Sequence, residues 1–149
     1  MGRVVTVDGL LNAVDADREA GLTIALANGC FDLLHVGHVR YLSGAAEQAD
    51  RLVVAINSDS IVTALKGQRQ PILPEDERAE LVAALCMVDY VVVFSTPTVA
   101  DLLKVLRPNV HCKGTDYTVD TVPEREIVRR YGGRTMIVGD PKNHSTQSL

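Results

Sequence analysis

The sequence predicts an α/β protein in which a doubly wound parallel sheet is covered by helices on both faces. Short, almost wholly apolar segments alternate with longer segments whose apolar residues recur at helical spacing. The segment 51–57, Arg-Leu-Val-Val-Ala-Ile-Asn, is typical of a strand buried on both faces of a parallel sheet. The 149 residues, 46% of them hydrophobic, suffice for one domain with a substantial core. We therefore expect one domain over residues 1–149, with its ligand at the carboxyl ends of the strands.

The first half of the chain predicts, in order, a helix in an amino-terminal extension (residues 1–22), a strand, a helix, a strand and a short helix. These elements are expected at residues 8–19, 23–27, 39–49, 51–57 and 60–65. Asp8 can cap the first helix, and Gly21 ends it. Asn57, Ser58 and Asp59 can cap the last helix of this half.

The second half predicts a polar loop, a helix, a strand, a helix, a short strand, a helix and a final strand. These elements are expected at residues 66–74, 75–87, 89–94, 98–106, 109–112, 124–131 and 134–138. Gly67 and two prolines favour the loop. Acidic residues from Glu75 onward suit the positive end of a helix dipole. Pro108 and the Gly132-Gly133 pair end the other two helices.

Composition excludes several classes of function. The net charge of −4 gives no basic footprint, so nucleic acid is not expected as a partner. No apolar run has the length of a membrane span and the start lacks a signal-peptide core, which favours the cytoplasm and no membrane. Cys30, Cys86 and Cys112 are too scattered for a disulfide framework or a zinc site. Cys86 and Cys112 stand in apolar runs and are expected to be buried.

The most informative segment is Asn28 to His38, Asn-Gly-Cys-Phe-Asp-Leu-Leu-His-Val-Gly-His. It follows the predicted strand 23–27 and leads into a helix, whose first N–H groups and dipole attract phosphate. His35 and His38 flank Gly37; the imidazoles can donate to phosphoryl oxygens, and the glycine lets backbone approach a ligand. One histidine alone would be explained as a cap or a core residue. The pair in this setting predicts a nucleotide phosphate site.

Polar residues also follow the other predicted strands. The groups are Asn57 to Asp59, Lys113 to Tyr117 and Asp140 to Thr146. Because the carboxyl ends of parallel strands meet at one edge, these groups are expected to converge with the histidines. Each also has a simpler interpretation: a helix cap for the first and for Ser145-Thr146, and a turn for the second. Lys66 is either a solvated charge or a clamp that its loop brings over phosphates.

Two common phosphate motifs are absent from the sequence. Neither Gly-x-Gly-x-x-Gly nor Gly-x-x-x-x-Gly-Lys-[Ser/Thr] occurs, which disfavours a dinucleotide site and a P-loop kinase. The Cys30 thiol has no partner that would make it a nucleophile. Phosphoryl chemistry in this chain would therefore depend on the histidine pair.

The histidine segment, with Asn57-Ser58-Asp59, Lys66-Gly67, Glu77-Arg78 and Lys113 to Tyr117, resembles the cytidylyltransferase-like branch of the His-x-Gly-His nucleotidyltransferases. The similarity runs from about Thr23 to Thr146. Within that branch, Asn-Gly-Cys-Phe-Asp and Lys-Gly-Thr-Asp-Tyr are most similar to the adenylyltransferases of ADP-heptose synthesis. The resemblance implies a single Rossmann-like nucleotidyltransferase domain. The chain is expected to lack the carboxyl-terminal helix with which that family continues.

The resemblance also implies roles for individual residues. Contacts to the triphosphate at the reacting centre are implied for His35, His38 and Lys66. Nucleotide contacts are implied for Asn28, Gly29, Cys30, Phe31, Gly37, Gly114, Asp116, Tyr117, Ser145 and Thr146. Sugar-phosphate contacts are implied for Asp32, Asn57, Asp59, Arg78 and Lys113, with the triphosphate as the alternative partner of Arg78.

The implied reaction transfers AMP from ATP to D-glycero-β-D-manno-heptose 1-phosphate, giving ADP-heptose and pyrophosphate for lipopolysaccharide core biosynthesis. Mg²⁺ is expected to arrive with ATP, held by the phosphates and not by a dedicated set of protein ligands. A homodimer is implied as well. Two other functions stay open: a cytidylyltransferase acting on glycerol 3-phosphate or another phospho-alcohol, and a non-catalytic module that binds nucleotide as a sensor.

Overall fold

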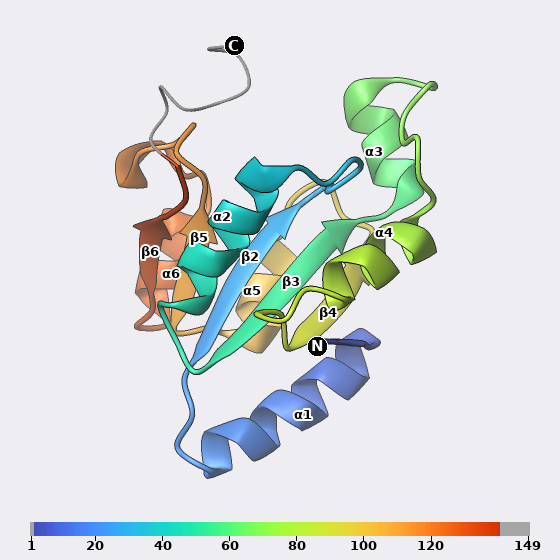
Figure 1. Cartoon of the computed structure of the whole chain (residues 1–149). Coiled ribbons are helices and arrows are strands. Elements are labelled where there is room, and N and C mark those ends of the chain that lie inside the picture. Colours follow the sequence, from blue (N-terminus) through green and yellow to red (C-terminus); the bar gives the residue numbers. More distant parts are fainter. Residues whose placement is uncertain (1, 141–149) are drawn as a thin grey trace.

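One sheet of six parallel strands is formed by residues 2–140, the part of the chain that this computed structural model describes (Figure 1). Its spatial order is β1 (Arg3–Val4), β4 (Tyr90–Phe94), β3 (Arg51–Asn57), β2 (Ile24–Gly29), β5 (Val110–Lys113) and β6 (Arg134–Ile137). The helices are α1 (Val7–Glu19), α2 (Val36–Ala46), α3 (Asp59–Lys66), α4 (Glu75–Ala83), α5 (Ala100–Leu106) and α6 (Arg125–Arg130), with a 3₁₀ turn η1 (Val119–Thr121). The predicted doubly wound α/β sheet is confirmed.

Each face of the sheet has its own core, and the alternation of side chains along the strands supplies both. On β2, Ala25 and Ala27 join the core under α2 and α4, whereas Ile24 and Leu26 join the core under α1, α5 and α6. This two-sided burial is the physical reason for the continuous apolar strands in the sequence. Burial of each leucine or isoleucine side chain stabilises the folded state by about 1.5–3 kcal/mol relative to leaving it exposed.

The order of the strands places a switch point beside β2. From β2 the chain winds through β3 to β4 in one direction, and then crosses back so that β5 pairs with the other edge of β2. Helix α2, in the crossover from β2 to β3, and helix α5, in the crossover from β4 to β5, pack on opposite faces of the sheet, so the carboxyl ends of β2 and β5 form a topological switch point. In open α/β sheets this is where ligands bind. The histidine segment begins at the end of β2, and Gly114 follows the last residue of β5, Lys113.

Helix starts are the main difference from the sequence-based prediction. Thr6, and not Asp8, caps α1, because its Oγ1 accepts the N–H of Gly9 at 3.1 Å. The helix behind the histidine segment begins at Val36, three residues before the predicted start, because His35 itself is its N-cap. The helix predicted to end at Met87 ends at Ala83 and continues as turns.

Three further features were not predicted. The short strand β1 extends the sheet beyond β4, and η1 precedes α6. Cys86 is exposed, which contradicts the expectation that it is buried, whereas Cys112 is buried as expected. No helix within residues 2–140 is both long and apolar enough to cross a membrane.

Candidate functional site

A cavity of about 200 Å³ opens at the switch point between β2 and β5. Its lining comes from the end of β2, the first turns of α2 and the segment after β5: Asn28, Gly29, Cys30, Phe31, His38, Tyr41, Lys113, Gly114, Asp116 and Tyr117. All of these except Tyr41 were predicted as site residues. Tyr41 lies one helical turn after His38, so helical spacing on α2 would have indicated it.

Each of the two histidine rings accepts a backbone hydrogen bond at the start of α2. Nδ1 of His35 accepts the N–H of Gly37 at 3.1 Å, and Nδ1 of His38 accepts the N–H of His35 at 3.2 Å. A backbone N–H can only donate, so both Nδ1 atoms carry lone pairs, and a neutral imidazole then has its hydrogen on Nε2. The ring centroids are 4.0 Å apart. The segment therefore offers a pair of adjacent Nε2–H donors beside a helix N-terminus.

His38 is neutral at physiological pH. Burial, together with the nearby His35 and Lys66, lowers its pKa from 6.5 to about 4. Position 37 has no room for a side chain, because a Cβ on Gly37 would lie 2.8 Å from Cε1 of His35. The His38 imidazole is thus suited to act as a fixed hydrogen-bond donor to phosphate.

The Phe31 side chain packs against the His38 ring. Phe31 is buried, and its φ of 50° lies in the left-handed region, which costs a non-glycine residue roughly 1 kcal/mol or more. Its ring meets that of His38 edge-on at 5.5 Å, and a Cβ at Gly29 would lie 3.1 Å from it. The strained backbone at Phe31 therefore fixes the path between β2 and α2.

The opposite wall of the cavity comes from the segment after β5. The ammonium of Lys113 lies 4.6 Å from the ring centroid of Tyr117, whose N–H closes a turn onto the carbonyl of Gly114 at 3.1 Å. Burial lowers the pKa of Lys113, and Glu124 and Cys30 partly oppose that effect. The hydroxyl of Tyr41 donates to the carbonyl of Cys112 at 2.7 Å and ties α2 to β5. The wall therefore presents a partly buried cation.

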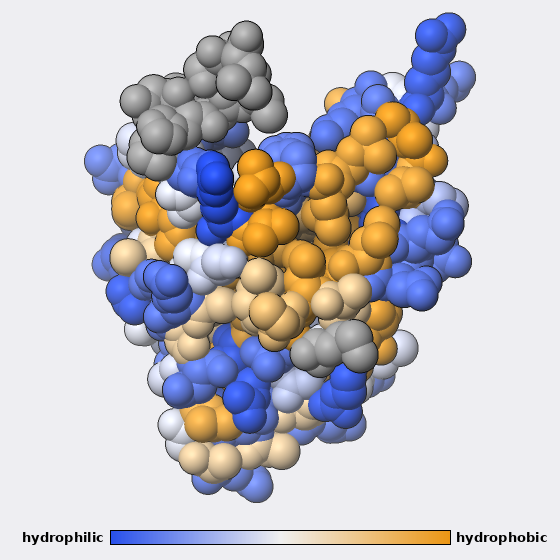
Figure 2. Space-filling model, in the orientation of Figure 1, coloured by the Kyte–Doolittle hydropathy of each residue, from blue (hydrophilic) through white to orange (hydrophobic). Residues whose placement is uncertain are grey.

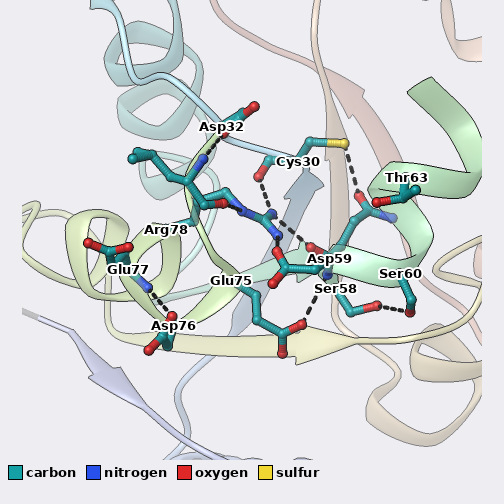
Figure 3. Close-up of polar contacts among 12 residues, drawn as sticks. Cys30, Asp32, Ser58, Asp59, Ser60, Thr63, Glu75, Asp76, Glu77 and Arg78 are labelled. Atoms are coloured by element: carbon teal, nitrogen blue, oxygen red, sulfur yellow. Dashed lines mark hydrogen bonds and ion pairs between the residues drawn. The ribbon is translucent and has the colours of Figure 1, made fainter. Parts of the chain in front are cut away.

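Arg78 has no exposed surface and lies at the centre of a hydrogen-bond network (Figure 3). Its guanidinium donates to the carbonyls of Leu73 (3.0 Å), Cys30 (2.7 Å) and Asn57 (2.8 Å), and to the carboxylate of Asp59 (2.7 Å). We expected Arg78, Asn57 and Asp59 to contact the sugar phosphate. In this structure the enclosed guanidinium of Arg78 binds the Asn57 carbonyl and the Asp59 carboxylate, and the Asp59 side chain stays 42% exposed.

The neighbouring side chains complete that network. Oδ1 of Asn57 lies 3.7 Å from the sulfur of Cys30, as acceptor of a weak S–H hydrogen bond. Glu75 accepts the N–H of Asp59 at 3.0 Å and caps α3 (Figure 3). Arg78 thereby joins the ends of β2 and β3, the start of α3 and the segment before α4.

Asp32 also has an internal partner where a substrate contact was expected. Its carboxylate accepts the N–H groups of Ile72 and Leu73, each at 2.8 Å. Burial raises the pKa of Asp32, but those hydrogen bonds, with Arg78 and Lys66, outweigh it and lower the pKa overall. Lys66 is exposed at the end of α3, and its charge acts on both Asp32 and His38. It therefore stands at the rim of the site.

Apolar surface also lies near the site. Figure 2 shows apolar surface over the upper part of this face, between α2 and α3. Large exposed apolar residues are Val36 on α2, Leu65 on α3, and Leu33 and Ile72 in the loops before α2 and α4. Ser145 and Thr146 lie outside the described residues. Within residues 2–140, no group of three or more His, Cys, Asp or Glu side chains is arranged to hold a metal ion.

Comparison with known proteins gives matches over nearly the whole chain. The sequence profile of the family described as cytidylyltransferase-like matches residues 26–147. The chain is 44% identical to the bifunctional protein HldE of Geobacter sulfurreducens over 147 residues, which are 99% of this chain and 30% of that protein. It is 45% identical to HldE of Ectopseudomonas mendocina over 146 residues, 98% of this chain and 31% of that one. The chain thus spans about 30% of the length of these relatives.

A solved structure is also similar. The lipopolysaccharide core biosynthesis protein from Thermoplasma volcanium GSS1 aligns with a TM-score of 0.65 and 28% identity. The alignment covers 78% of this chain and 94% of that protein. The fold is therefore shared with a protein described as a lipopolysaccharide core biosynthesis protein.

Proposed function

This chain belongs to the cytidylyltransferase-like family, and from that premise we propose that it transfers AMP from ATP to D-glycero-β-D-manno-heptose 1-phosphate. The products are ADP-heptose and pyrophosphate. The observation that carries the proposal is the pair of imidazoles held as Nε2–H donors at the N-terminus of α2. The names of the relatives, HldE and a lipopolysaccharide core biosynthesis protein, support the heptose as acceptor.

The reaction needs positioning and charge stabilisation more than proton transfer. A phosphate oxygen of the sugar 1-phosphate forms a new bond to the α-phosphorus of ATP. The bond from that phosphorus to the bridging oxygen of the β-phosphate breaks, and pyrophosphate leaves with the electron pair. The attacking oxygen is already anionic, so neither a general base nor a covalent enzyme intermediate is required.

The described residues supply the matching donors. His35 and His38 would donate through Nε2 to oxygens of the α-phosphate, where negative charge is redistributed in the transition state. The N–H groups at the start of α2 would add to them. Lys66 would reach the β- and γ-phosphates from the rim, and Lys113 would face the nucleotide from the other wall. Ser145 and Thr146 are proposed to close on the same phosphates.

Mg²⁺ is proposed as the metal that accompanies ATP. Because the described part of the chain offers no ready set of protein ligands, the triphosphate oxygens would hold it. It would supply neutralisation of the phosphate charge, which lets the anionic acceptor approach.

The proposal is tested by measuring pyrophosphate release with ATP, CTP, GTP and UTP, each with heptose 1-phosphate and Mg²⁺. We expect turnover with ATP, and a loss of two or more orders of magnitude in kcat for His35→Ala or His38→Ala with the fold intact. Preference for CTP with glycerol 3-phosphate would support the cytidylyltransferase alternative. ATP binding without turnover on any acceptor would support the sensor alternative.

We further propose that the chain acts as a homodimer in the cytoplasm, which the family resemblance implies. Light scattering of the purified protein during gel filtration would give the mass of the assembly. A monomer mass of 16.1 kDa at assay concentration would contradict the dimer.

A further inference from the structure

A buried imidazole that the proposed mechanism does not use lies beside the nucleotide cavity. His111, within β5, has no exposed surface, and its Nε2 lies 2.8 Å from Oδ1 of Asn28. β5 pairs with β2 at the switch point, where His111 is in register with Leu26. Asn28 lies two residues beyond Leu26 and lines the cavity. The pair therefore connects the core under α1, α5 and α6 to the cavity wall.

The surroundings of His111 determine which ring nitrogen carries the hydrogen. Its Nδ1 is buried and has no hydrogen-bond partner within residues 2–140. A hydrogen on Nδ1 would leave a buried donor unpaired, and unpaired buried donors are rarer and more costly than unpaired acceptors. The hydrogen is therefore on Nε2, and Nε2 donates to Oδ1 of Asn28.

The charge of the imidazole is consistent with this tautomer. Burial, with a contribution from Lys113, lowers the pKa of His111 from 6.5 to about 3. The ring is thus neutral at physiological pH and keeps one donor and one orientation. A protonated ring would need a second acceptor at Nδ1, and none lies there among the described residues.

The orientation of the Asn28 carboxamide follows from that of His111. With Oδ1 turned to the imidazole, the Nδ2 group keeps two N–H donors, and no described residue accepts a hydrogen bond from it. Lys113, two residues after His111 on β5, lines the same cavity and can also only donate. Although the Asp116 carboxylate lines the same cavity, the Asn28 amide and the Lys113 ammonium are suited to acceptor atoms, which a nucleotide carries on its phosphates, ribose and base.

We propose that His111 is a positioning residue for nucleotide binding: it holds Asn28 so that the amide N–H groups of Asn28 bind an acceptor atom of the nucleotide. The inference rests on the proposed function for its ligand, ATP. Without the His111 donor, Oδ1 loses its partner, and the carboxamide can rotate and present an acceptor to the ligand. An acceptor facing an acceptor would weaken binding.

Three variants separate this role from simple packing. His111→Leu keeps an apolar side chain of similar bulk but removes the donor, His111→Gln keeps an N–H donor of similar reach, and Asn28→Ala removes the carboxamide. Calorimetry should show ATP bound about five- to tenfold more weakly by His111→Leu, with KM raised by the same factor and kcat little changed. His111→Gln should restore most of the affinity. In the Asn28→Ala background, His111→Leu should cause no further loss.

Tyr131→Phe is the matched control, because it removes the hydrogen bond from the Tyr131 hydroxyl to the carbonyl of Pro108 on the same side of the sheet. It should lower the melting temperature without changing the Kd for ATP. Nitrogen-15 NMR of the ligand-free protein reads the tautomer of His111 independently of ATP.

The outcomes distinguish the two hypotheses. An Nδ1–H tautomer, wild-type ATP affinity in His111→Leu, or additive losses in the double variant would overturn the role of His111 while leaving the proposed function in place. A wild-type protein that shows the Nε2–H tautomer but binds no ATP would count against the proposed function and, with it, against the nucleotide as ligand of Asn28.

Discussion

Replacing Arg78 tests whether its guanidinium braces the site or binds a substrate. The residue is fully enclosed, and its hydrogen bonds hold the carbonyls of Cys30, Asn57 and Leu73 together with the carboxylate of Asp59. Arg78→Ala removes every one of these donors at once. We expect a large loss of stability and a loss of activity that follows from displaced loops.

The magnitude can be worked out from the partners. The Asp59 carboxylate is 42% exposed, so water can replace its ion pair, which contributes less than about 1 kcal/mol. The three carbonyls are buried or partly buried, and each left without its donor costs on the order of 1 kcal/mol. The sum is about 3–4 kcal/mol. For a chain of 149 residues this corresponds to a fall in Tm of roughly 6–16 °C.

Urea unfolding and thermal melting of Arg78→Ala and Arg78→Lys would measure this effect. Lysine keeps the charge but cannot span the separate acceptors with one ammonium group, so it should recover less than half of the loss. Arg129→Ala is the matched control, because the Arg129–Glu126 pair is exposed and should change stability by less than about 0.5 kcal/mol. Wild-type stability of Arg78→Ala, with a raised KM for the sugar phosphate alone, would refute the brace and restore the substrate contact expected from the sequence.

Three other predictions concern the histidines and the rim. Gly37→Ala should change the free energy of unfolding by less than about 1 kcal/mol but lower the rate of pyrophosphate release at least tenfold. The reason is that the new Cβ would lie 2.8 Å from Cε1 of His35 and would displace that imidazole. An unchanged kcat would contradict this. The pKa of His111 is lowered to about 3 in the native protein, so between pH 6.5 and about 3 the unfolded chain binds a proton at this residue and the native chain does not. The free energy of unfolding therefore decreases as the pH is lowered through that window. Between pH 7 and pH 5 the wild type should therefore lose about 2 kcal/mol more than His111→Gln in urea titrations, and parallel losses would refute the shift. Lys66→Ala should leave the melting curve unchanged, since the side chain is exposed, and lower kcat/KM for ATP by about tenfold or more; an unchanged kcat/KM would show that Lys66 is only a solvated charge.

The sequence predicts the strands and the cavity lining well because both depend on local patterns. Buried strands such as 51–57 are continuous apolar runs, and the structure gives β3 the same bounds. In a parallel sheet the residues after each strand converge at one edge, so a segment such as Lys113 to Tyr117 could be placed near the histidines without a structure. The helix start at Val36 was missed because histidine is an unusual N-cap, and only the observed exchange of hydrogen bonds between His35 and His38 reveals it.

The internal partners of Asp32 and Arg78 could not be predicted for a different reason. Their partners lie far away along the chain: Asp32 binds N–H groups 40 and 41 residues later, and Arg78 binds a carbonyl 48 residues earlier. A charged residue beside a phosphate motif is expected to bind the ligand, and only the three-dimensional structure reveals that it also forms hydrogen bonds with other parts of the protein. The same holds for His111, which sits in an ordinary apolar strand and gives no signal in the sequence.

These internal pairings explain how a chain with a net charge of −4 can offer a site to a polyanion. The carboxylates of Asp32 and Asp59 lie near the histidine segment and would repel a triphosphate if they were unpartnered. Asp32 instead accepts backbone N–H groups, and Asp59 is paired with Arg78. The groups left to face the ligand are mainly donors, from the Nε2–H pair of His35 and His38 to the ammonium groups at the rim and wall. Asp32 and Asp59 thus hold the loops in place, while Asp116 lines the cavity beside the donors. The donors that face the ligand can stabilise the charge of its phosphates.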